Sequence, residues 1–219
     1  MIITGTKHHE MERYIVPAET LPAICVGVID CGTQQWEYMG EAKSGKKLRL
    51  QWELPTEEWE DDEGRNRART ISHEYTASLH EKSNLRKNLI SWRGRDFTEE
   101  ELAGFDMTEL LGKPCMLSVI HKNKANGTGS YAKIDAVTKL AKGITVPEVA
   151  ITPLTTYSLE DGDNEVFRAF PEWIQNIISS CVEWQSKPAK PEVKKAAEKV
   201  AKALEGKVVP SQDEMDVPF

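Results

Sequence analysis

Three segments in the first part of the chain have the apolar and polar pattern of β-strands. The run ICVGVID (residues 24–30) is short, apolar and rich in β-branched side chains, which predicts a buried strand with a bulge or a sharp bend at Gly27. The segment KKLRLQWEL (residues 46–54) alternates strictly, which predicts a strand with one core face and one solvated face. Its apolar positions are Leu48, Leu50, Trp52 and Leu54, so Trp52 is expected in the core. RTISHEYTASL (residues 69–79) alternates likewise and predicts a third strand.

The period then becomes helical. In SNLRKNLISWRG (residues 83–94) the large apolar side chains recur at helical spacing, with Ser83 or Asn84 as the capping residue at the start and Gly94 at the end. FTEEELAGF and DMTELLGKP predict two short helical turns. Strands return after Pro114, where CMLSVIHK and SYAKIDAVTKL flank the hairpin signal NKANGTG.

Three strands, a helical insertion and two more strands follow the order of an OB-fold, the small barrel that binds oligonucleotides on its second and third strands and in its hairpin loops. We therefore expect a mainly β protein: a five-stranded OB-fold barrel with a helical insertion between strands 3 and 4 and a C-terminal helical extension. An SH3-like barrel and an α+β sandwich fit the same spacing.

Three regions are expected along the chain. Residues 1–150 form the OB-fold DNA-binding domain. Residues 151–186 form a helical extension packed on the barrel, because DGDNEVFRAFPEWIQNIISSCVEW (residues 161–184) carries an apolar helical face. Residues 187–219 form a linker with a thinly apolar spacer helix, followed by a disordered acidic partner-binding tail.

Composition narrows the class of protein. Lys and Arg number 28 against 35 Asp and Glu, for a net charge of −7, so any basic surface must be local. No apolar run approaches the roughly 20 residues of a membrane span, and the N-terminus lacks the order of a signal peptide. The 4 Cys show no CxxC pair, which is typical of buried free thiols in a reducing compartment. We expect a cytoplasmic protein without a membrane partner.

Signatures of catalysis are missing from the sequence. It contains no GxxxxGK[ST], HExxH or GxSxG motif. His73 lies within the predicted third strand and His80 just after it, seven residues away, which is not the spacing of a pair of metal ligands. We therefore expect no metal site and no cofactor. The acidic run over residues 57–63 is interpreted as a solvated loop, with a divalent ion site as the alternative.

Local clusters of basic and aromatic residues favour binding of single-stranded nucleic acid, which requires cations for phosphates and flat rings for bases. The candidates fall on the first hairpin loop, the second strand, the entry to the third strand and the last hairpin. They are Trp36, Tyr38, Lys43, Lys46, Lys47, Arg49, Arg65, Arg67, Arg69, Lys122, Lys124 and Tyr131. The alternative is that the basic residues only solubilise the loops and the rings cap the barrel.

The sequence finishes with SQDEMDVPF, which suits a docking peptide: a ring for an apolar pocket, a stiffening proline and acids that steer the encounter. The candidate partner-binding residues are Asp213, Glu214, Asp216, Val217, Pro218 and Phe219. This segment resembles the acidic C-terminal tip of bacterial single-stranded DNA-binding proteins, which ends in a run of Asp followed by Ile-Pro-Phe. Here Met215 interrupts the acids and Val replaces Ile.

The body of the chain carries a second resemblance. KLRLQWELP, the long segment LHEKSNLRKNLISWRGRDFTEEELAGFDMTELLGKPC and YAKIDAVTKL resemble a group of bacteriophage proteins of the replication and recombination module, over about residues 21–184. The resemblance implies an OB-fold, single-stranded DNA binding and a location in the host cytoplasm, but not which residues touch DNA. Arg93 and Arg95 either hold phosphates or pair with the acids at residues 99–101, and we favour pairing.

The expected function is therefore sequence-independent binding of single-stranded DNA in phage replication and recombination, without enzymatic activity. The acidic tip is expected to recruit replication or recombination proteins and to compete for the basic groove when DNA is absent. The alternatives are an adaptor of a recombinase or polymerase that does not bind DNA, and a metal-dependent nuclease. The oligomeric state is open, with a homo-oligomer as one alternative.

Overall fold

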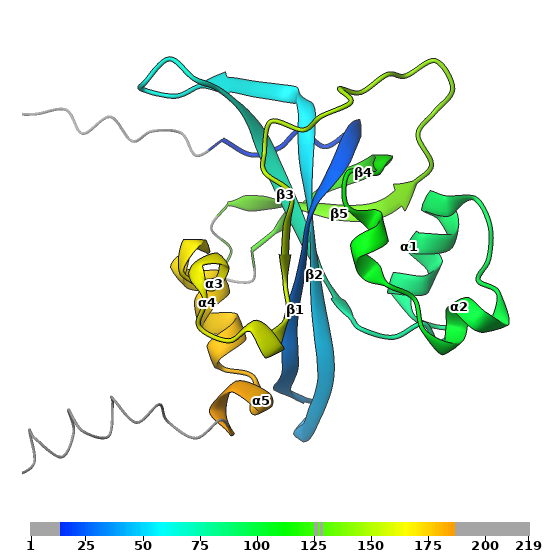
Figure 1. Cartoon of the computed structure of the whole chain (residues 1–219), viewed down its shortest axis with the longest axis vertical. Coiled ribbons are helices and arrows are strands. Elements are labelled where there is room, and N and C mark those ends of the chain that lie inside the picture. The colour runs from blue at the N-terminus through cyan, green and yellow to red at the C-terminus, as the bar shows by residue number, and fades with distance from the viewer. Residues whose placement is uncertain (1–13, 125–126, 128, 187–219) are drawn as a thin grey trace, which may run out of the picture. The chain divides into compact units, whose positions relative to one another are not determined.

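A computed structural model describes residues 14–124, 127 and 129–186. Its sheet has the strand order β3-β2-β1-β4-β5, all neighbours antiparallel, and a short β6 runs parallel to β1 (Figure 1). The strands are β1 (Thr20–Tyr38), β2 (Glu41–Glu60), β3 (Asn66–Thr76), β4 (Pro114–Asn123), β5 (Ser130–Thr138) and β6 (Thr155–Tyr157). The helices are α1 (Asn84–Arg93), α2 (Glu99–Ala103), α3 (Glu165–Ala169), α4 (Glu172–Ser179) and α5 (Val182–Gln185), with 3-10 turns η1 (Met107–Leu110) and η2 (Leu159–Asp161).

The predicted mainly β class and the order of elements are confirmed, but the sheet is open. Its edge strands β3 and β5 form no hydrogen-bonded ladder within the described residues, so closure of a barrel is not confirmed. The two edges nevertheless come within 8 Å of each other between Cα atoms. Burial, and then the charge of Lys133 on β5, lower the pKa of His73 on β3. The compact unit that contains the sheet ends at Trp184.

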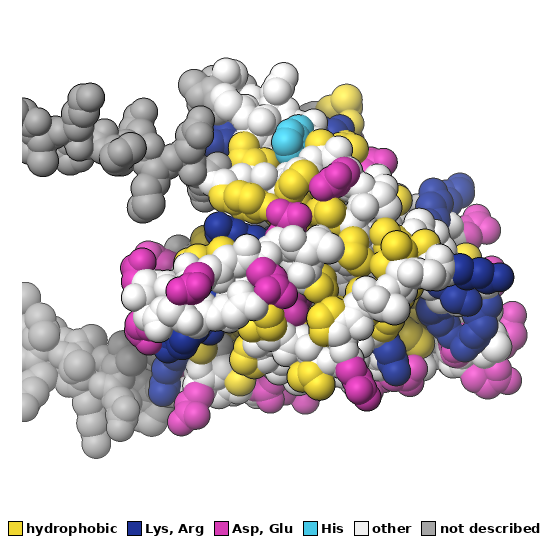
Figure 2. All heavy atoms as spheres, turned by 90° about the horizontal axis from the view of Figure 1, so that it is seen from above, with side chains coloured by type: hydrophobic (Ala, Val, Ile, Leu, Met, Phe, Trp, Pro, Cys, Tyr) yellow, Lys and Arg dark blue, Asp and Glu magenta, His cyan; other side chains and the backbone are white. Residues whose placement is uncertain are grey.

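The helix α1 begins and ends where the sequence predicts. The Ser83 side chain accepts a hydrogen bond from the backbone N–H of Arg86, and Gly94 adopts φ 72°, where its N–H donates to the carbonyl of Ile90. Arg93, the last residue of α1, and Arg95 beyond the helix both pair with Glu101 on α2, which confirms the predicted pairing of these arginines with the acids. Figure 2 shows basic and acidic side chains gathered together over α1 and α2 rather than a patch of one sign.

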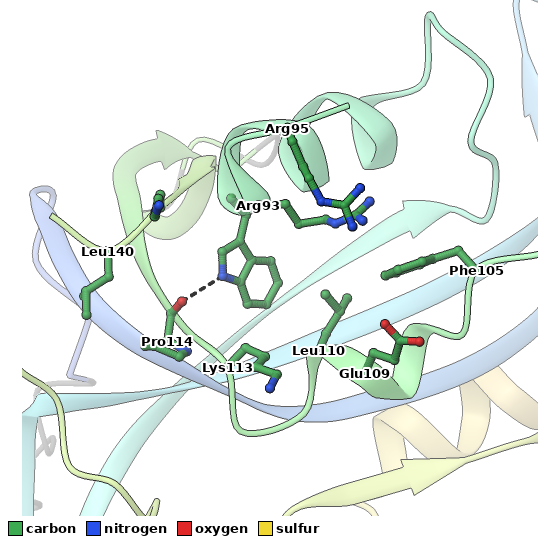
Figure 3. A pocket seen from close by; sticks show the side chains of 10 residues that line it. Arg93, Arg95, Phe105, Glu109, Leu110, Lys113, Pro114 and Leu140 are labelled. Carbon is green, nitrogen blue, oxygen red and sulfur yellow. Dashed lines mark hydrogen bonds between the residues drawn. The ribbon is translucent and has the colours of Figure 1, made fainter. Parts of the chain in front are cut away.

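The main core lies between one face of the sheet and α1. The alternating apolar side of β2 is buried there with Leu85, Leu89 and Trp92 from the helix. Trp52 is fully buried, as predicted, with its ring centroid 6.1 Å from that of Trp92. The indole Nε1–H of Trp92 donates to the carbonyl of Pro114 at 2.8 Å, which ties the helix to the start of β4 (Figure 3). The four cysteines are free and buried, as the sequence predicted.

A second, smaller core covers the opposite face of β1. Ile29 and Cys31 pack there against apolar side chains of α3 and α4, including Ile174 and Ile178. Figure 1 shows α3 and α4 on one side of the β1–β2 pair and α1 and α2 on the other. No helix in the described ranges is long and apolar enough to cross a membrane.

The prediction of a fully solvated second face on β2 was wrong at Glu53. This residue is completely buried, and its two carboxylate oxygens accept hydrogen bonds from the backbone N–H groups of Ile151 and Thr152. The burial results from a tertiary contact, because the chain that follows β5 crosses this face of β2 and encloses the carboxylate. A period of two in the sequence identifies the two faces of a strand, but not what later segments cover.

Candidate nucleic-acid interface

The β1–β2 hairpin continues well past the core as a two-stranded ribbon. Its register pairs Trp36 with Lys43 and Tyr38 with Glu41, and only a tight turn separates the strands. Met39 and Gly40 both have positive φ, at 53° and 77°, as a two-residue primed hairpin turn requires. The prediction that Trp36 and Tyr38 lie in a hairpin loop was therefore wrong, since both residues belong to β1.

Two aromatic rings and two lysines alternate on one face of this ribbon, and we call these four residues the ladder. They are Trp36, Tyr38, Lys43 and Lys47. The Lys47 Nζ lies 4.4 Å from the centroid of the Trp36 ring, and the Lys43 Nζ lies 4.7 Å from that of Tyr38. The rings remain 39% and 53% exposed, respectively. The ladder thus presents rings and cations together to solvent.

Gly45 makes room for the tryptophan of the ladder. A Cβ atom at this position would lie 3.3 Å from Cη2 of the Trp36 ring, closer than ordinary van der Waals contact. Because the glycine has no side chain, the indole can lie across the neighbouring strand between Lys43 and Lys47. The position of the ring is therefore set by packing on the ribbon, although the domain core does not reach it.

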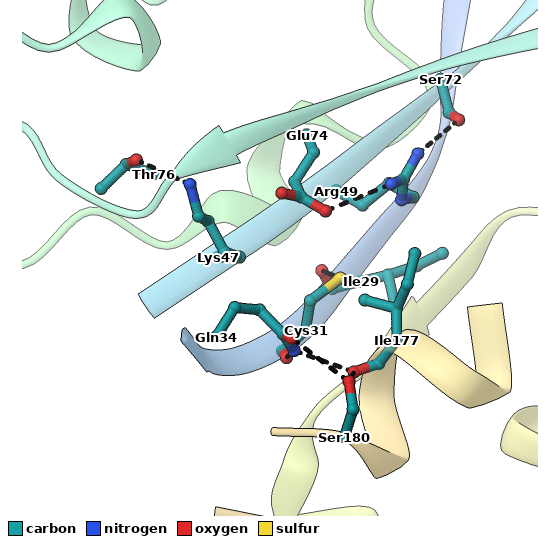
Figure 4. Close-up of polar contacts among 10 residues, drawn as sticks. All are labelled: Ile29, Cys31, Gln34, Lys47, Arg49, Ser72, Glu74, Thr76, Ile177 and Ser180. Atoms are coloured by element: carbon teal, nitrogen blue, oxygen red, sulfur yellow. Dashed lines mark hydrogen bonds and ion pairs between the residues drawn. The ribbon is translucent and has the colours of Figure 1, made fainter. Parts of the chain in front are cut away.

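Arg49 continues the same face toward the body of the domain, but it is engaged internally. Its guanidinium donates to Ser72 Oγ at 3.1 Å and to the Glu74 carboxylate at 3.2 Å (Figure 4), and its side chain is only 13% exposed. The ring of Trp173 on α4 lies over the guanidinium, with 4.9 Å between the guanidinium carbon and the ring centroid.

Trp173 is a candidate that the sequence analysis missed. Its sequence context predicts a place within the apolar face of the C-terminal helices, yet it is 49% exposed and adjoins the ladder through Arg49. The start of the helix could have indicated this exposure, because Pro171 immediately precedes α4. Ile174 and Ile178, four residues apart, form the buried face of that helix, and Trp173 lies only at the border of this face.

Lys46 does not join the ladder. It precedes Lys47 by one residue on β2 and therefore points to the other face of the ribbon. There its Nζ pairs with Asp30 at 3.1 Å. This lysine contributes to the charge of the hairpin without sharing the surface of Trp36 and Tyr38.

The arginines of the β2–β3 hairpin are held by acids and rings of the same hairpin. Arg65 and Arg67 both pair with Asp61 at 2.9 Å. The backbone N–H of Arg65, then the side chains of Arg67 and Arg65, lower the pKa of Asp61 to about 2. The Arg69 guanidinium lies between the rings of Tyr14 and Trp59, at 4.3 and 4.9 Å. This cluster lies at the opposite end of β2 from the ladder.

The acidic run proposed as an alternative ion site is divided between β2 and the turn after it. Asp61 is occupied by the two arginines, and Tyr14 donates to Glu57. Across the part of the chain that the structure describes, no three His, Cys, Asp or Glu side chains come together as metal ligands would.

The β4–β5 hairpin presents a further pair of the predicted type. Lys122 and Tyr131 are register partners, so their side chains share one face of the hairpin, where Tyr131 is exposed. Neither Lys122 nor Lys124 has an ion pair with another described residue. The candidate partner-binding residues Asp213, Glu214, Asp216, Val217, Pro218 and Phe219 lie outside the described residues.

The structure therefore brings four of the twelve predicted nucleic-acid contacts into one exposed array and adds Trp173 beside them. The others lie on the opposite face of the ribbon, in internal ion pairs or stacks, or on the separate β4–β5 hairpin. Comparison of the chain with protein-family models, curated proteins and solved structures finds no match.

Proposed function

We propose that this chain is a sequence-independent single-stranded DNA-binding protein that acts in phage replication and recombination. The observation that carries the proposal is the ladder, in which each exposed ring has a lysine ammonium within 5 Å of its centroid. Bases stack on exposed rings with about 1–3 kcal/mol each, and they do so with little regard to sequence. The two lysines supply the counter-charge that the phosphates between stacked bases require.

The arrangement of the strands supports an OB-type barrel as the scaffold of this activity. In the observed order, pairing of β3 with β5 would close the sheet into the ring of an OB-fold, and these two edges already approach each other. The β1–β2 and β4–β5 hairpins, which carry exposed rings and lysines, are the hairpins with which that fold binds oligonucleotides. Recruitment of replication or recombination partners by the acidic tip is part of the same proposal.

Titration of the protein with a single-stranded dT oligonucleotide tests the proposal through its intrinsic tryptophan fluorescence. Stacking on Trp36 should quench the emission, and affinity should fall as salt rises. If only the two ladder lysines neutralise phosphates, the slope of log K against log salt should be about −1.4. A duplex of the same length serves as the control and should bind far more weakly, because its bases are not free to stack. Equal binding of both, or of neither, would refute the proposal, and absence of any binding would favour the adaptor.

Substitution of Trp173 tests whether the interface continues onto α4. Trp173→Ala should weaken dT binding about 5-fold, the lower end of a stacking contribution. Trp173→Phe keeps a ring over Arg49 and should retain most of the affinity. The thermal unfolding midpoint should change little in both variants, because the ring is half exposed. Unchanged dT affinity in Trp173→Ala would confine the interface to the hairpins.

A further inference from the structure

An open pocket of about 430 Å³ lies on the α1 side of the sheet, away from the ladder. Its apolar lining comes from Trp92, Phe105, Leu110, Pro114 and Leu140. Figure 3 shows Arg93 and Arg95 extending side by side along one wall, with Phe105, Leu110, Glu109 and Lys113 arranged around the opening. The pocket thus combines a flat apolar floor with cationic walls.

Cations outnumber carboxylates around this pocket, although the protein as a whole is acidic. Arg93, Arg95, Lys113 and Lys139 line it, against Glu109 in the lining and Glu101, which pairs with both arginines. Neither lysine has an ion pair with another residue in the described ranges. An anion entering the pocket would therefore meet cationic groups that are free to bind it.

Arg93 also keeps a donor without an acceptor. Its guanidinium carbon lies 4.4 and 5.0 Å from the ring centroids of Phe97 and Phe105, which contact each other edge to face, and Nη2 donates to Glu101. Nη1 is buried and finds no hydrogen-bond partner among the described residues. Because Nη1 has no accessible surface, an anion in the pocket would meet the ammonium groups of Lys113 and Lys139 rather than this donor.

The backbone around the pocket is fixed in place before any ligand arrives. The N–H of Lys139 donates to the carbonyl of Ser91 at 3.1 Å, and the carbonyl of Lys113 accepts from the N–H of Cys25 at 3.1 Å. The Trp92 indole is held by Pro114. A ligand would therefore order only the two lysine side chains, which limits the entropic cost of binding.

We propose that this pocket binds a small aromatic ligand that carries a carboxylate. The apolar floor suits a flat ring, and the carboxylate would pair with the ammonium groups of Lys113 and Lys139. A nucleotide fits less well, because Glu109 is the only lining side chain able to accept from the edge of a base. The site is separate from the ladder and does not depend on DNA binding.

A matched pair of ligands tests the proposal on the full chain: N-acetyl-L-phenylalanine and its neutral amide, followed by ¹⁵N-resolved NMR. The Trp92 indole N–H resonance reports the floor of the pocket directly. The carboxylate should shift this resonance in a saturable way, whereas the amide should bind at least 10-fold more weakly. Inorganic phosphate alone should not shift it. Equal effects of the acid and the amide, or no saturable shift, would overturn the proposal.

Substitutions of surface residues provide a second test of the pocket. Lys113→Ala with Lys139→Ala should weaken binding of the acid about 10-fold, and Glu109→Gln should tighten it, since it removes the one carboxylate of the lining. Lys122→Ala with Lys124→Ala removes two lysines outside the pocket and should leave the affinity unchanged. Identical affinities of all three variants for the acid would show that the pocket is not the binding site.

Discussion

Replacing Trp36 and Tyr38 together by alanine is expected to weaken the binding of single-stranded DNA about 100-fold. Two stacked bases lose their platforms, and a loss of about 1.4 kcal/mol for each base, in the lower half of the range of about 1–3 kcal/mol, corresponds to this factor. The ribbon should keep its structure, because both rings are exposed and lie outside the two cores. The measurement is a dT titration followed by fluorescence anisotropy of the oligonucleotide, which does not depend on the tryptophans.

Trp59 offers a matched control for this loss. It is also a surface tryptophan in a cation–π contact, 42% exposed, but its ring is engaged with Arg69 at the far end of β2. Trp59→Ala should change dT affinity by less than about 2-fold. The conservative pair Trp36→Phe with Tyr38→Phe keeps two rings and should bind nearly as the natural chain does. A double alanine variant that still binds dT normally would show that the ladder is not the interface.

The sequence predicted the elements of the fold well, because each rests on a local signal. The strict alternation in β2 places Trp52 in the core, and Ser83 and Gly94 bound α1 through their own hydrogen bonds. Of the bulge or sharp bend expected at Gly27, the bulge is present, as a shift of register between Cys25 and Gly27. These features depend on neighbours along the chain, so a single sequence is enough to identify them.

The candidate site was harder to predict, because it depends on which segments meet in space. Lys46 and Lys47 look equivalent in the sequence, yet they lie on opposite faces of a ribbon whose length the sequence did not reveal. Arg49 was expected on an open surface, but Glu74 and Trp173 reach it from β3 and α4. Closure of the sheet depends likewise on β3 and β5, which are far apart along the chain.

Replacing Glu53 by alanine is expected to lower the stability of the protein more than alanine at any other polar position of the alternating pattern on β2. The substitution leaves the backbone N–H groups of Ile151 and Thr152 buried without an acceptor, and it opens a void in a fully enclosed position. Each unsatisfied donor costs about 1–3 kcal/mol, so the free energy of unfolding should fall by about 3 kcal/mol. Urea unfolding followed by circular dichroism measures this loss, and the thermal midpoint should fall by about 6–12 °C.

Two further variants separate the hydrogen bonds of Glu53 from its position on the strand. Glu53→Gln keeps one oxygen that can accept from the crossing segment, so it should lose about half as much stability as the alanine variant. Gln51→Ala changes the preceding residue on the same face, where the side chain is only half-buried, and should cost less than about 0.5 kcal/mol. If Glu53→Ala were as mild as Gln51→Ala, the carboxylate would not hold the segment after β5.

Since that segment leads directly into β6 and the second core, a severe effect in Glu53→Ala should also loosen α4 and reduce the protection of Trp173 from acrylamide quenching.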